Sequence, residues 1–235
     1  MHDSHYLARR GQIEHYFDRT AVQAWERLTS DAPVGRIRAT VRAGRDRMRE
    51  ELLSWLPARM DGLRLLDAGC GTGALSQAAA ERGAQVLAID LSPTLVGLAS
   101  ERHRLGGHPM DGRIDFRSGD MLDDALGVFD HVVAMDSLIH YDTPQIVQAV
   151  QRLALRTRRS MLFTFAPRTP LLAAMHRVGR LFPRSDRSPS LEPQSETRLR
   201  EQLHAALAPA GWREGRSQRV ASGFYTSQAW EWVRA

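Results

Sequence analysis

Glycines and acids gather in one short segment in the first third of the chain. The segment reads Asp67-Ala68-Gly69-Cys70-Gly71-Thr72-Gly73 and continues an apolar run at 63–66. Glycine has no Cβ, so a loop of this kind can turn tightly and bring its backbone against a bound ligand. A further acid, Asp90, ends the next apolar run 21 residues after Gly69. This spacing predicts a ribose-containing cofactor, held by the glycine backbone and by the Asp90 carboxylate.

Two classes of cofactor fit this loop. Gly69, Gly71 and Ala74 match G-x-G-x-x-[GA], the dinucleotide fingerprint, in which Asp90 is the ribose-binding acid. The same segment matches D-x-G-x-G-x-G, the loop that binds S-adenosylmethionine (AdoMet) in Rossmann-like methyltransferases. Asp67 favours the second interpretation, because an acid two residues before the first glycine is not part of the dinucleotide fingerprint.

Two features further along the chain also favour AdoMet. Asp120 follows the third apolar run, in Ser118-Gly119-Asp120-Met121, where methyltransferases place an acid against the adenine amino group. Two strand-like runs, 212–220 and 224–233, follow a Pro-Ala-Gly stop near the C-terminus. They resemble the last two strands of the seven-stranded methyltransferase sheet.

The resemblance to this class of enzymes implies a role for each residue. Gly69 and Gly71 would pass close to the methionine part of AdoMet. Asp90 would accept hydrogen bonds from both ribose hydroxyls, and Asp120 would hold adenine. The alternative is that the two acids only cap the turns that follow them. The full set of cofactor-binding candidates is Asp67, Gly69, Gly71, Gly73, Asp90, Leu91, Asp120, Met121 and Met135.

Strands and helices alternate along the part of the chain that carries these residues. Strand-like runs lie at 63–67, 85–89, 113–117, 129–135 and 160–165, and helical segments lie at 74–82, 93–105, 143–153 and around 199–207. We expect Ser92 and Thr143-Pro144 to begin two of these helices. Such alternation predicts βαβ units and a mostly parallel sheet. The expected fold is therefore α/β and Rossmann-like, with seven strands and a C-terminal antiparallel hairpin.

Two regions stand apart from this alternation. Residues 1–57 predict an N-terminal helical cap or arm, with one helix over 12–30 and a second from Asp31 to Pro57. The Pro- and Arg-rich stretch 166–193 predicts a helical insertion after the fifth strand. The core, 58–235, and the cap are expected to form one folding unit.

The composition is that of an ordinary globular protein. The 235 residues are 43 % hydrophobic and 25 % charged, which excludes disordered and collagen-like chains. All 32 basic residues are arginines, but they are spread along the chain as the acids are, so nucleic-acid binding is not favoured. The single cysteine, Cys70, is interpreted as a small filler. No signal peptide opens the chain and no histidine pair has metal-ligand spacing, so we expect a cytoplasmic protein with no metal of its own.

Several segments outside the glycine loop carry a closer resemblance. They are 15–21 (HYFDRTA), 25–30 (WERLTS), 38–45 (RATVRAGR), 135–141 (MDSLIHY), 164–170 (TFAPRTP) and 181–189 (LFPRSDRSP). In these segments the chain resembles the magnesium-protoporphyrin IX O-methyltransferases of chlorophyll and bacteriochlorophyll synthesis. The resemblance runs from about residue 14 to the C-terminus. One departure is Thr29, where relatives from the oxygenic branch carry tyrosine.

This resemblance implies a substrate, magnesium-protoporphyrin IX, and a product, the monomethyl ester of one propionate. The magnesium would arrive within the substrate, by handover from the magnesium-inserting enzyme. A planar apolar ring with two carboxylates calls for an apolar cleft with arginines at its rim. Arginines recur on one face of the second helix, at Arg38, Arg42, Arg45 and Arg49, and the insertion pairs an apolar stripe with arginines. The substrate-binding candidates are Arg38, Arg42, Tyr141, Arg168, Arg177 and Arg180.

For both arginine sets the alternative is an ordinary amphipathic or solvated helix face. The insertion, 170–182, also has the pattern of a helix that lies in a membrane interface, so we expect weak peripheral membrane contact.

His140 and Tyr16 are the candidate catalytic residues. His140 follows the fourth strand, where this fold exposes side chains beside the methyl donor, and Tyr16 lies in one of the matching segments. We expect His140 to orient the substrate carboxylate, with a role as base or as axial magnesium ligand as alternatives. Asp136 is a second candidate for that ligand.

Three other functions remain open from the sequence. The chain could methylate another small acid or phenol, act as an NAD-dependent oxidoreductase, or bind and carry a tetrapyrrole without catalysis. Stabilisation by AdoMet but not by NAD would exclude the oxidoreductase.

Overall fold

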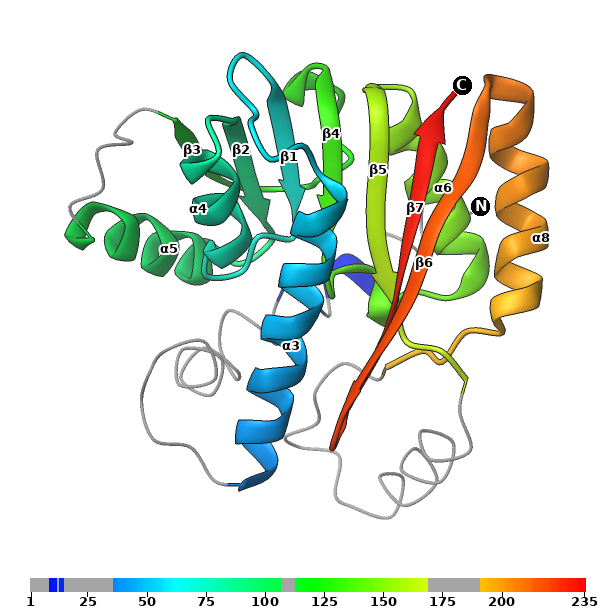
Figure 1. Cartoon of the computed structure of the whole chain (residues 1–235), viewed down its shortest axis with the longest axis horizontal. Coiled ribbons are helices and arrows are strands. Elements are labelled where there is room, and N and C mark those ends of the chain that lie inside the picture. The colour runs from blue at the N-terminus through cyan, green and yellow to red at the C-terminus, as the bar shows by residue number, and fades with distance from the viewer. Residues whose placement is uncertain (1–8, 12, 15–35, 107–112, 169–190) are drawn as a thin grey trace.

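A single seven-stranded sheet forms the centre of the molecule (Figure 1). The computed structural model describes residues 9–11, 13–14, 36–106, 113–168 and 191–235. The strands are β1 (Arg64–Ala68), β2 (Gln85–Asp90), β3 (Ile114–Ser118), β4 (Phe129–Ala134), β5 (Thr157–Phe165), β6 (Trp212–Ser222) and β7 (Tyr225–Arg234). Their order across the sheet is β3-β2-β1-β4-β5-β7-β6.

The strand directions confirm the predicted fold class. The neighbours among β1 to β5 pair in parallel, whereas β7 is antiparallel to both β5 and β6. The C-terminal hairpin thus forms one edge of the sheet, as the two strand-like runs predicted. Because the parallel strands all run the same way, their carboxyl ends meet along one edge, where α/β folds bind ligands.

Helices cover both faces of the sheet (Figure 1). They are α3 (Arg36–Trp55), α4 (Ala74–Glu81), α5 (Pro93–Leu105), α6 (Thr143–Ala154) and α8 (Glu196–Leu207), with short 3-10 turns η2 (Asp124–Leu126), η3 (Leu138–His140) and η5 (Ala208–Ala210). Alternate strand residues point to opposite faces and so feed two cores. Leu65 joins the core beneath α3 and α4, and the adjacent Leu66 joins the core beneath α6 and α8.

The helix starts are set by side-chain caps. Ser92 Oγ accepts a hydrogen bond from the backbone N–H of Leu95, which confirms the predicted start of α5. For α6 the prediction was wrong by one residue. Asp142 is the cap, and it forms a capping box with Gln145, so Thr143 lies in the first turn. A carboxylate binds the exposed N–H groups of a first turn well, which makes Asp142 the better cap.

The N-terminal region is only partly described. The second predicted helix is confirmed as α3, and its residues Met48, Leu52 and Leu56 are buried. Residues 9–11 and 13–14 are helical, and Ile13 packs into the core beneath α6. Most of the predicted first helix, the start at Asp31 and most of the insertion lie outside the described residues. In the described part, no helix has the length and apolarity needed to cross a membrane.

Candidate active site

The glycine loop lies between β1 and α4 and is tied to the end of β2. The backbone N–H groups of Gly69 and Cys70 both donate to the carbonyl of Ile89, at 2.8 and 3.0 Å. Gly69 and Gly73 have φ values of +89° and +79°, a region that side chains with a Cβ rarely adopt. A Cβ at Gly69 would also collide with Ser137, which follows β4. The glycines therefore let the loop after β1 lie directly against the end of β2 and the segment that follows β4.

Asp90 joins the loop to the start of α5. Its Oδ2 accepts from the N–H of Gly71 at 2.8 Å, and its Oδ1 accepts from the N–H of Ser92 at 3.0 Å. Burial raises the pKa of this carboxyl, and backbone hydrogen bonds from Ser92, Gly71 and Leu91 act in the opposite direction. The acid therefore does cap the following turn, but a carboxylate accepts about four hydrogen bonds. Acceptor capacity thus remains at Asp90 for a ribose hydroxyl.

Asp67 lies beneath the loop. Its side chain is buried, and its Oδ2 accepts from Ser76 Oγ of α4 at 2.5 Å. Desolvation, with a smaller contribution from the nearby charge of Asp90, raises the pKa of Asp67 to about 7, although the hydrogen bonds from Ser76 act to lower it. Asp67 therefore braces the loop against α4 in this structure.

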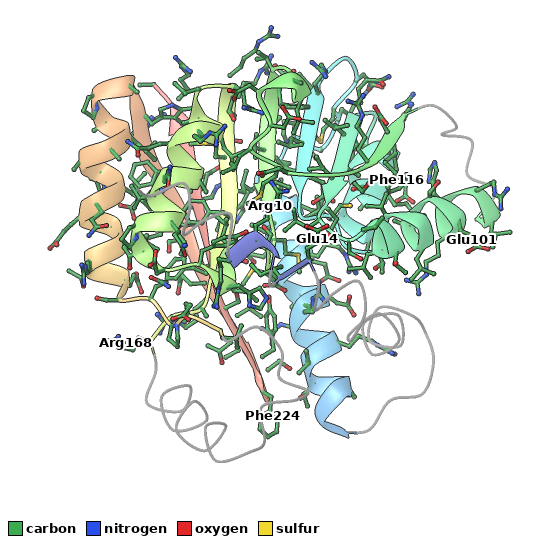
Figure 2. All side chains as sticks on the ribbon, turned by 180° about the vertical axis from the view of Figure 1, so that it is seen from behind. Arg10, Glu14, Glu101, Phe116, Arg168 and Phe224 are labelled. Carbon is green, nitrogen blue, oxygen red and sulfur yellow. The ribbon has the colours of Figure 1, made fainter. Side chains whose placement is uncertain are left out.

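Asp120 has a partner that the sequence gave no sign of. Its Oδ1 accepts from the N–H of Leu122 at 2.9 Å, which is the predicted cap alternative. Its Oδ2 pairs with Arg10 Nη1 at 3.1 Å. Figure 2 shows Arg10 and Glu14 on the short N-terminal helical segment, beside the sheet. The acid that we expected to hold adenine thus also holds residues from the start of the chain.

His140 lies in η3, just beyond the carboxyl end of β4. Its side chain is 5 % exposed, and its carbonyl accepts from Arg9 Nε at 2.7 Å. Arg9 also pairs with Glu192, at 3.2 Å. Arg9 and Arg10 together tie the N-terminal segment to η3, to Asp120 and to the far end of the insertion.

The substrate-binding candidates are not all in one place. Tyr141 is 3 % exposed and, like His140, is buried; it packs in the core beneath α6. Its apolar ring gains more from burial there than from the rim. Arg168 is exposed at the start of the insertion (Figure 2), and Arg42 is half-buried on α3. Tyr16, Arg177, Arg180 and the side chain of Arg38 lie outside the described residues.

The arginines of the predicted second helix, α3, have different partners in the structure. Arg49 pairs with Asp46 on the same helix, which fits a solvated face. Arg45 instead turns inward and pairs with Asp136, whose side chain is 5 % exposed. The row is therefore not a uniform rim for the substrate, because successive members meet different neighbours.

The site has a feature that fits an AdoMet-sized ligand. Ser137 Oγ is buried and has no hydrogen-bond partner among the described residues, and Ser137 faces Gly69. Met121 and Met135 are mostly buried, in the cores on opposite faces of the sheet, and Leu91 packs against the core that contains Met121. An orphaned hydroxyl, spare acceptor capacity at Asp90 and apolar methionines match a ligand with polar and apolar parts. No group of three or more His, Cys, Asp or Glu in the described ranges is arranged to hold a metal ion.

Comparison with known proteins identifies the family. Residues 134–234 match the family described as "Magnesium-protoporphyrin IX methyltransferase C-terminus", and 65–159 match a general methyltransferase domain. A magnesium-protoporphyrin O-methyltransferase of Rhodobacter capsulatus is 45 % identical over 97 % of this chain and 98 % of its own length. The chloroplastic enzyme of Arabidopsis thaliana is 29 % identical over 94 % of this chain and 70 % of its own length.

The solved structures agree. The magnesium protoporphyrin IX methyltransferase of Synechocystis with bound S-adenosylhomocysteine has a TM-score of 0.81 at 28 % identity, and covers 96 % of this chain and 99 % of its own. The same enzyme with bound AdoMet has a TM-score of 0.78 at 26 % identity, and covers 97 % of each chain. These matches extend through the N-terminal region and the insertion as well as the cofactor-binding core. The chain belongs to the magnesium-protoporphyrin IX methyltransferase family.

Proposed function

We propose that this enzyme transfers the methyl group of AdoMet to a propionate carboxylate of magnesium-protoporphyrin IX, giving the monomethyl ester in bacteriochlorophyll synthesis. The observation that carries this proposal is the extent of the match to the Rhodobacter enzyme, 97 % of this chain and 98 % of that one. Substrate specificity in this fold comes from segments outside the cofactor core, and those segments are included in the match.

The alternative substrates receive less support. A ubiquinone biosynthesis O-methyltransferase of Xanthomonas oryzae is 39 % identical, but over only 56 % of this chain. That match leaves nearly half of each chain uncovered, whereas the match to the Rhodobacter enzyme spans almost the whole of both. An oxidoreductase is disfavoured by the match to AdoMet-bound structures. A non-catalytic carrier would not need the intact glycine loop and Asp90.

The chemistry requires alignment more than proton transfer. AdoMet supplies the methyl group as an electrophilic sulfonium carbon. The substrate oxygen must meet that carbon in line, opposite the sulfur, at about 3 Å. A propionate resembles a Glu side chain, whose pKa is about 4.3, so it is ionised at neutral pH and already nucleophilic. A new C–O bond forms as the C–S bond breaks, with S-adenosylhomocysteine as the leaving product.

We assign the aligning role to His140. It lies just beyond β4, two residues after Leu138 in the same short turn, and close in sequence to Ser137 beside the glycine loop. A ring N–H of His140 would donate to one carboxylate oxygen and hold the other in line. Arg168, exposed at the start of the insertion, would bind the second propionate as a bidentate partner.

One assay tests the function. The enzyme is incubated with AdoMet and either magnesium-protoporphyrin IX, metal-free protoporphyrin IX or a phenolic ubiquinone precursor, and the products are identified by mass. A methyl ester of the magnesium porphyrin is expected, with S-adenosylhomocysteine in equal amount. Transfer to the phenol alone, or no transfer with any acceptor, would contradict the proposal.

We also propose a cytoplasmic enzyme that touches the membrane surface peripherally and receives its substrate from the magnesium-inserting enzyme. The support is the insertion sequence, whose spacing of Leu171, Met175, Val178 and Phe182 predicts an apolar helix face beside Arg177 and Arg180. At low salt the protein should sediment with anionic liposomes, and an Arg177→Gln/Arg180→Gln variant should sediment less. Turnover should also be faster with the inserting enzyme present than with free substrate. Absence of sedimentation would contradict the membrane contact, and absence of acceleration would contradict the handover of substrate.

A further inference from the structure

Asp136, the middle residue of the three that link β4 to η3, is held in an unusual backbone conformation. Its φ is +54°, and among the described residues it is the only one other than glycine with a positive φ. Asp tolerates this left-handed region better than most residues with a Cβ. Residues held in such sparsely populated conformations persist where the surrounding contacts fix them, and they cluster at functional sites.

Three elements hold the Asp136 carboxylate. The Tyr225 hydroxyl on β7 lies 3.1 Å from Oδ1 and 3.3 Å from Oδ2, and Arg45 Nε on α3 lies 3.2 Å from Oδ2. Thr164 Oγ1 on β5 lies 3.3 Å from Oδ1 and also accepts the N–H of Asp136, at 2.7 Å. Three donors, the Tyr225 hydroxyl, Arg45 Nε and Thr164 Oγ1, thus occupy most of the about four acceptor positions of this carboxylate.

Close packing brings these partners together. A Cβ at Gly44 would lie 2.6 Å from Cδ1 of the Tyr225 ring, and a Cβ at Gly223 would collide with Thr40. Glycine at 44 and 223 thus lets α3 pack directly against the C-terminal hairpin. Figure 1 shows α3 and the hairpin projecting past the same edge of the sheet. Arg45 and Tyr225 reach Asp136 because of this packing.

The Tyr225 hydroxyl stays protonated, as a permanent donor to the Asp136 carboxylate must. Burial raises the pKa of Tyr225 well above its ordinary value, and the neighbouring charge of Asp136 raises it further. The phenol therefore keeps its proton at every working pH and remains a donor to the carboxylate.

Asp136 stands between the two parts of the site that must be aligned. Ser137 follows it and faces Gly69 of the cofactor loop, and the turn that ends at His140 comes next. A change in the backbone conformation of residue 136 would therefore displace both Ser137 and the turn that carries His140.

We infer that Asp136 is a positioning residue for methyl transfer: its carboxylate, fixed by Arg45, Tyr225 and Thr164, sets the backbone that carries Ser137 and His140 beside the methyl donor. This inference rests on the proposed function, because it assigns His140 to alignment of the substrate carboxylate. A merely structural role would require only the left-handed turn, which glycine adopts more easily than aspartate.

The test separates the carboxylate from the turn. Asp136→Asn keeps the shape and tolerates the left-handed conformation but removes the charge. Asp136→Gly keeps the turn and removes the side chain. Tyr225→Phe keeps the ring against Gly44 and removes the hydroxyl. Asp142→Asn is the matched control, since it removes a nearby charge while Asn still caps α6.

Turnover and binding are measured on each folded variant. We expect kcat to fall at least about tenfold in both Asp136 variants and at least about threefold in Tyr225→Phe, because misalignment costs transition-state stabilisation. The Kd of AdoMet by calorimetry should stay within about threefold of wild type, and the control should keep its kcat. Adding Tyr225→Phe to Asp136→Asn should cause little further loss, since the two act through one contact.

Wild-type kcat in Asp136→Asn or in Asp136→Gly would overturn the inference. If neither Asp136 variant folds, Tyr225→Phe decides, and an unchanged kcat in that variant overturns it. Failure of the proposed function is distinguishable, because it would show as absence of ester formation by the wild-type enzyme itself.

Discussion

Asp90 connects the two backbone segments that surround the cofactor site. Its two oxygens bind the N–H groups of Gly71 and Ser92, so the carboxylate orders the loop and the start of α5 before any ligand binds. Such preorganisation lowers the entropy that binding would otherwise cost. We expect the same carboxylate to accept a hydrogen bond from the ribose of AdoMet.

Asp90→Ala should lower the affinity for AdoMet at least about tenfold, since each charge-assisted hydrogen bond contributes about 1.5–3 kcal/mol. Calorimetry with AdoMet and with its 2′-deoxy analogue checks the reason. The wild-type enzyme should bind the analogue more weakly than AdoMet, whereas Asp90→Ala should bind the two ligands with equal affinity. Equal Kd values for the two ligands in wild type would refute the ribose contact.

His140→Asn separates alignment from base catalysis. Asparagine keeps a hydrogen-bond donor but cannot accept a proton at neutral pH. We expect this variant to keep most of the wild-type kcat and His140→Ala to lose it, because an ionised carboxylate needs no base. Equal loss in both variants, with recovery at higher pH, would identify His140 as a base.

At the scale of elements, α3 and the C-terminal hairpin form the contact on which the arrangement around Asp136 depends. Gly44 removes the side chain that would separate them, and Tyr225 fills the space. Arg216 adds a bond from β6 to the carbonyl of Trp55, at the end of α3. Helix α3 is thus joined to β6, the edge strand on the opposite side of the sheet from β3.

Gly44→Ala should destabilise the enzyme by about 1–3 kcal/mol, because overpacking forces the Tyr225 ring or α3 to shift. Gly97→Ala is the control, since Gly97 is also helical and a Cβ there would meet nothing within 4 Å. That control should be neutral or more stable by up to about 1 kcal/mol. Urea unfolding measures both, and equal stabilities of the two variants would show that the close approach is unimportant.

At the scale of the whole molecule, the buried acids make stability depend on pH. Asp67 has its pKa raised to about 7 by burial, whereas an aspartate in the unfolded chain ionises near 3.9. Between these values the folded chain binds more protons than the unfolded chain. The free energy of unfolding contributed by Asp67 therefore falls as the pH rises from about 4 to about 7.

Asp67→Asn removes this dependence. Relative to wild type, the variant should gain stability between about pH 4 and pH 7, by on the order of a few kcal/mol. The Asn carboxamide oxygen can still accept from Ser76, and any change in the strength of that hydrogen bond shifts the whole curve without changing its slope. Denaturant unfolding at several pH values gives the difference, and parallel curves for the two proteins would contradict the raised pKa.

The sequence by itself determined the sheet, the glycine loop and the family. Strand and helix periods are local, and the positive φ values at Gly69 and Gly73 require residues that can be recognised without a structure. The position of Asp90 follows in the same way, because it ends the strand next to β1. The cap of α6 was misplaced by one residue, since Asp142 and Thr143 are both good caps and only the geometry separates them.

The tertiary structure alone decided which side chains meet. Asp136 and Tyr225 lie 89 residues apart and Arg10 and Asp120 lie 110 apart, and no periodic pattern relates either pair. Likewise the arginines on α3 recur at helical spacing, but the packing of α3 on the hairpin turns Arg45 toward Asp136, while Arg49 pairs with Asp46 on its own helix. Such contacts depend on how elements pack, which is set by the sum of many weak interactions along the chain rather than by any short stretch of it.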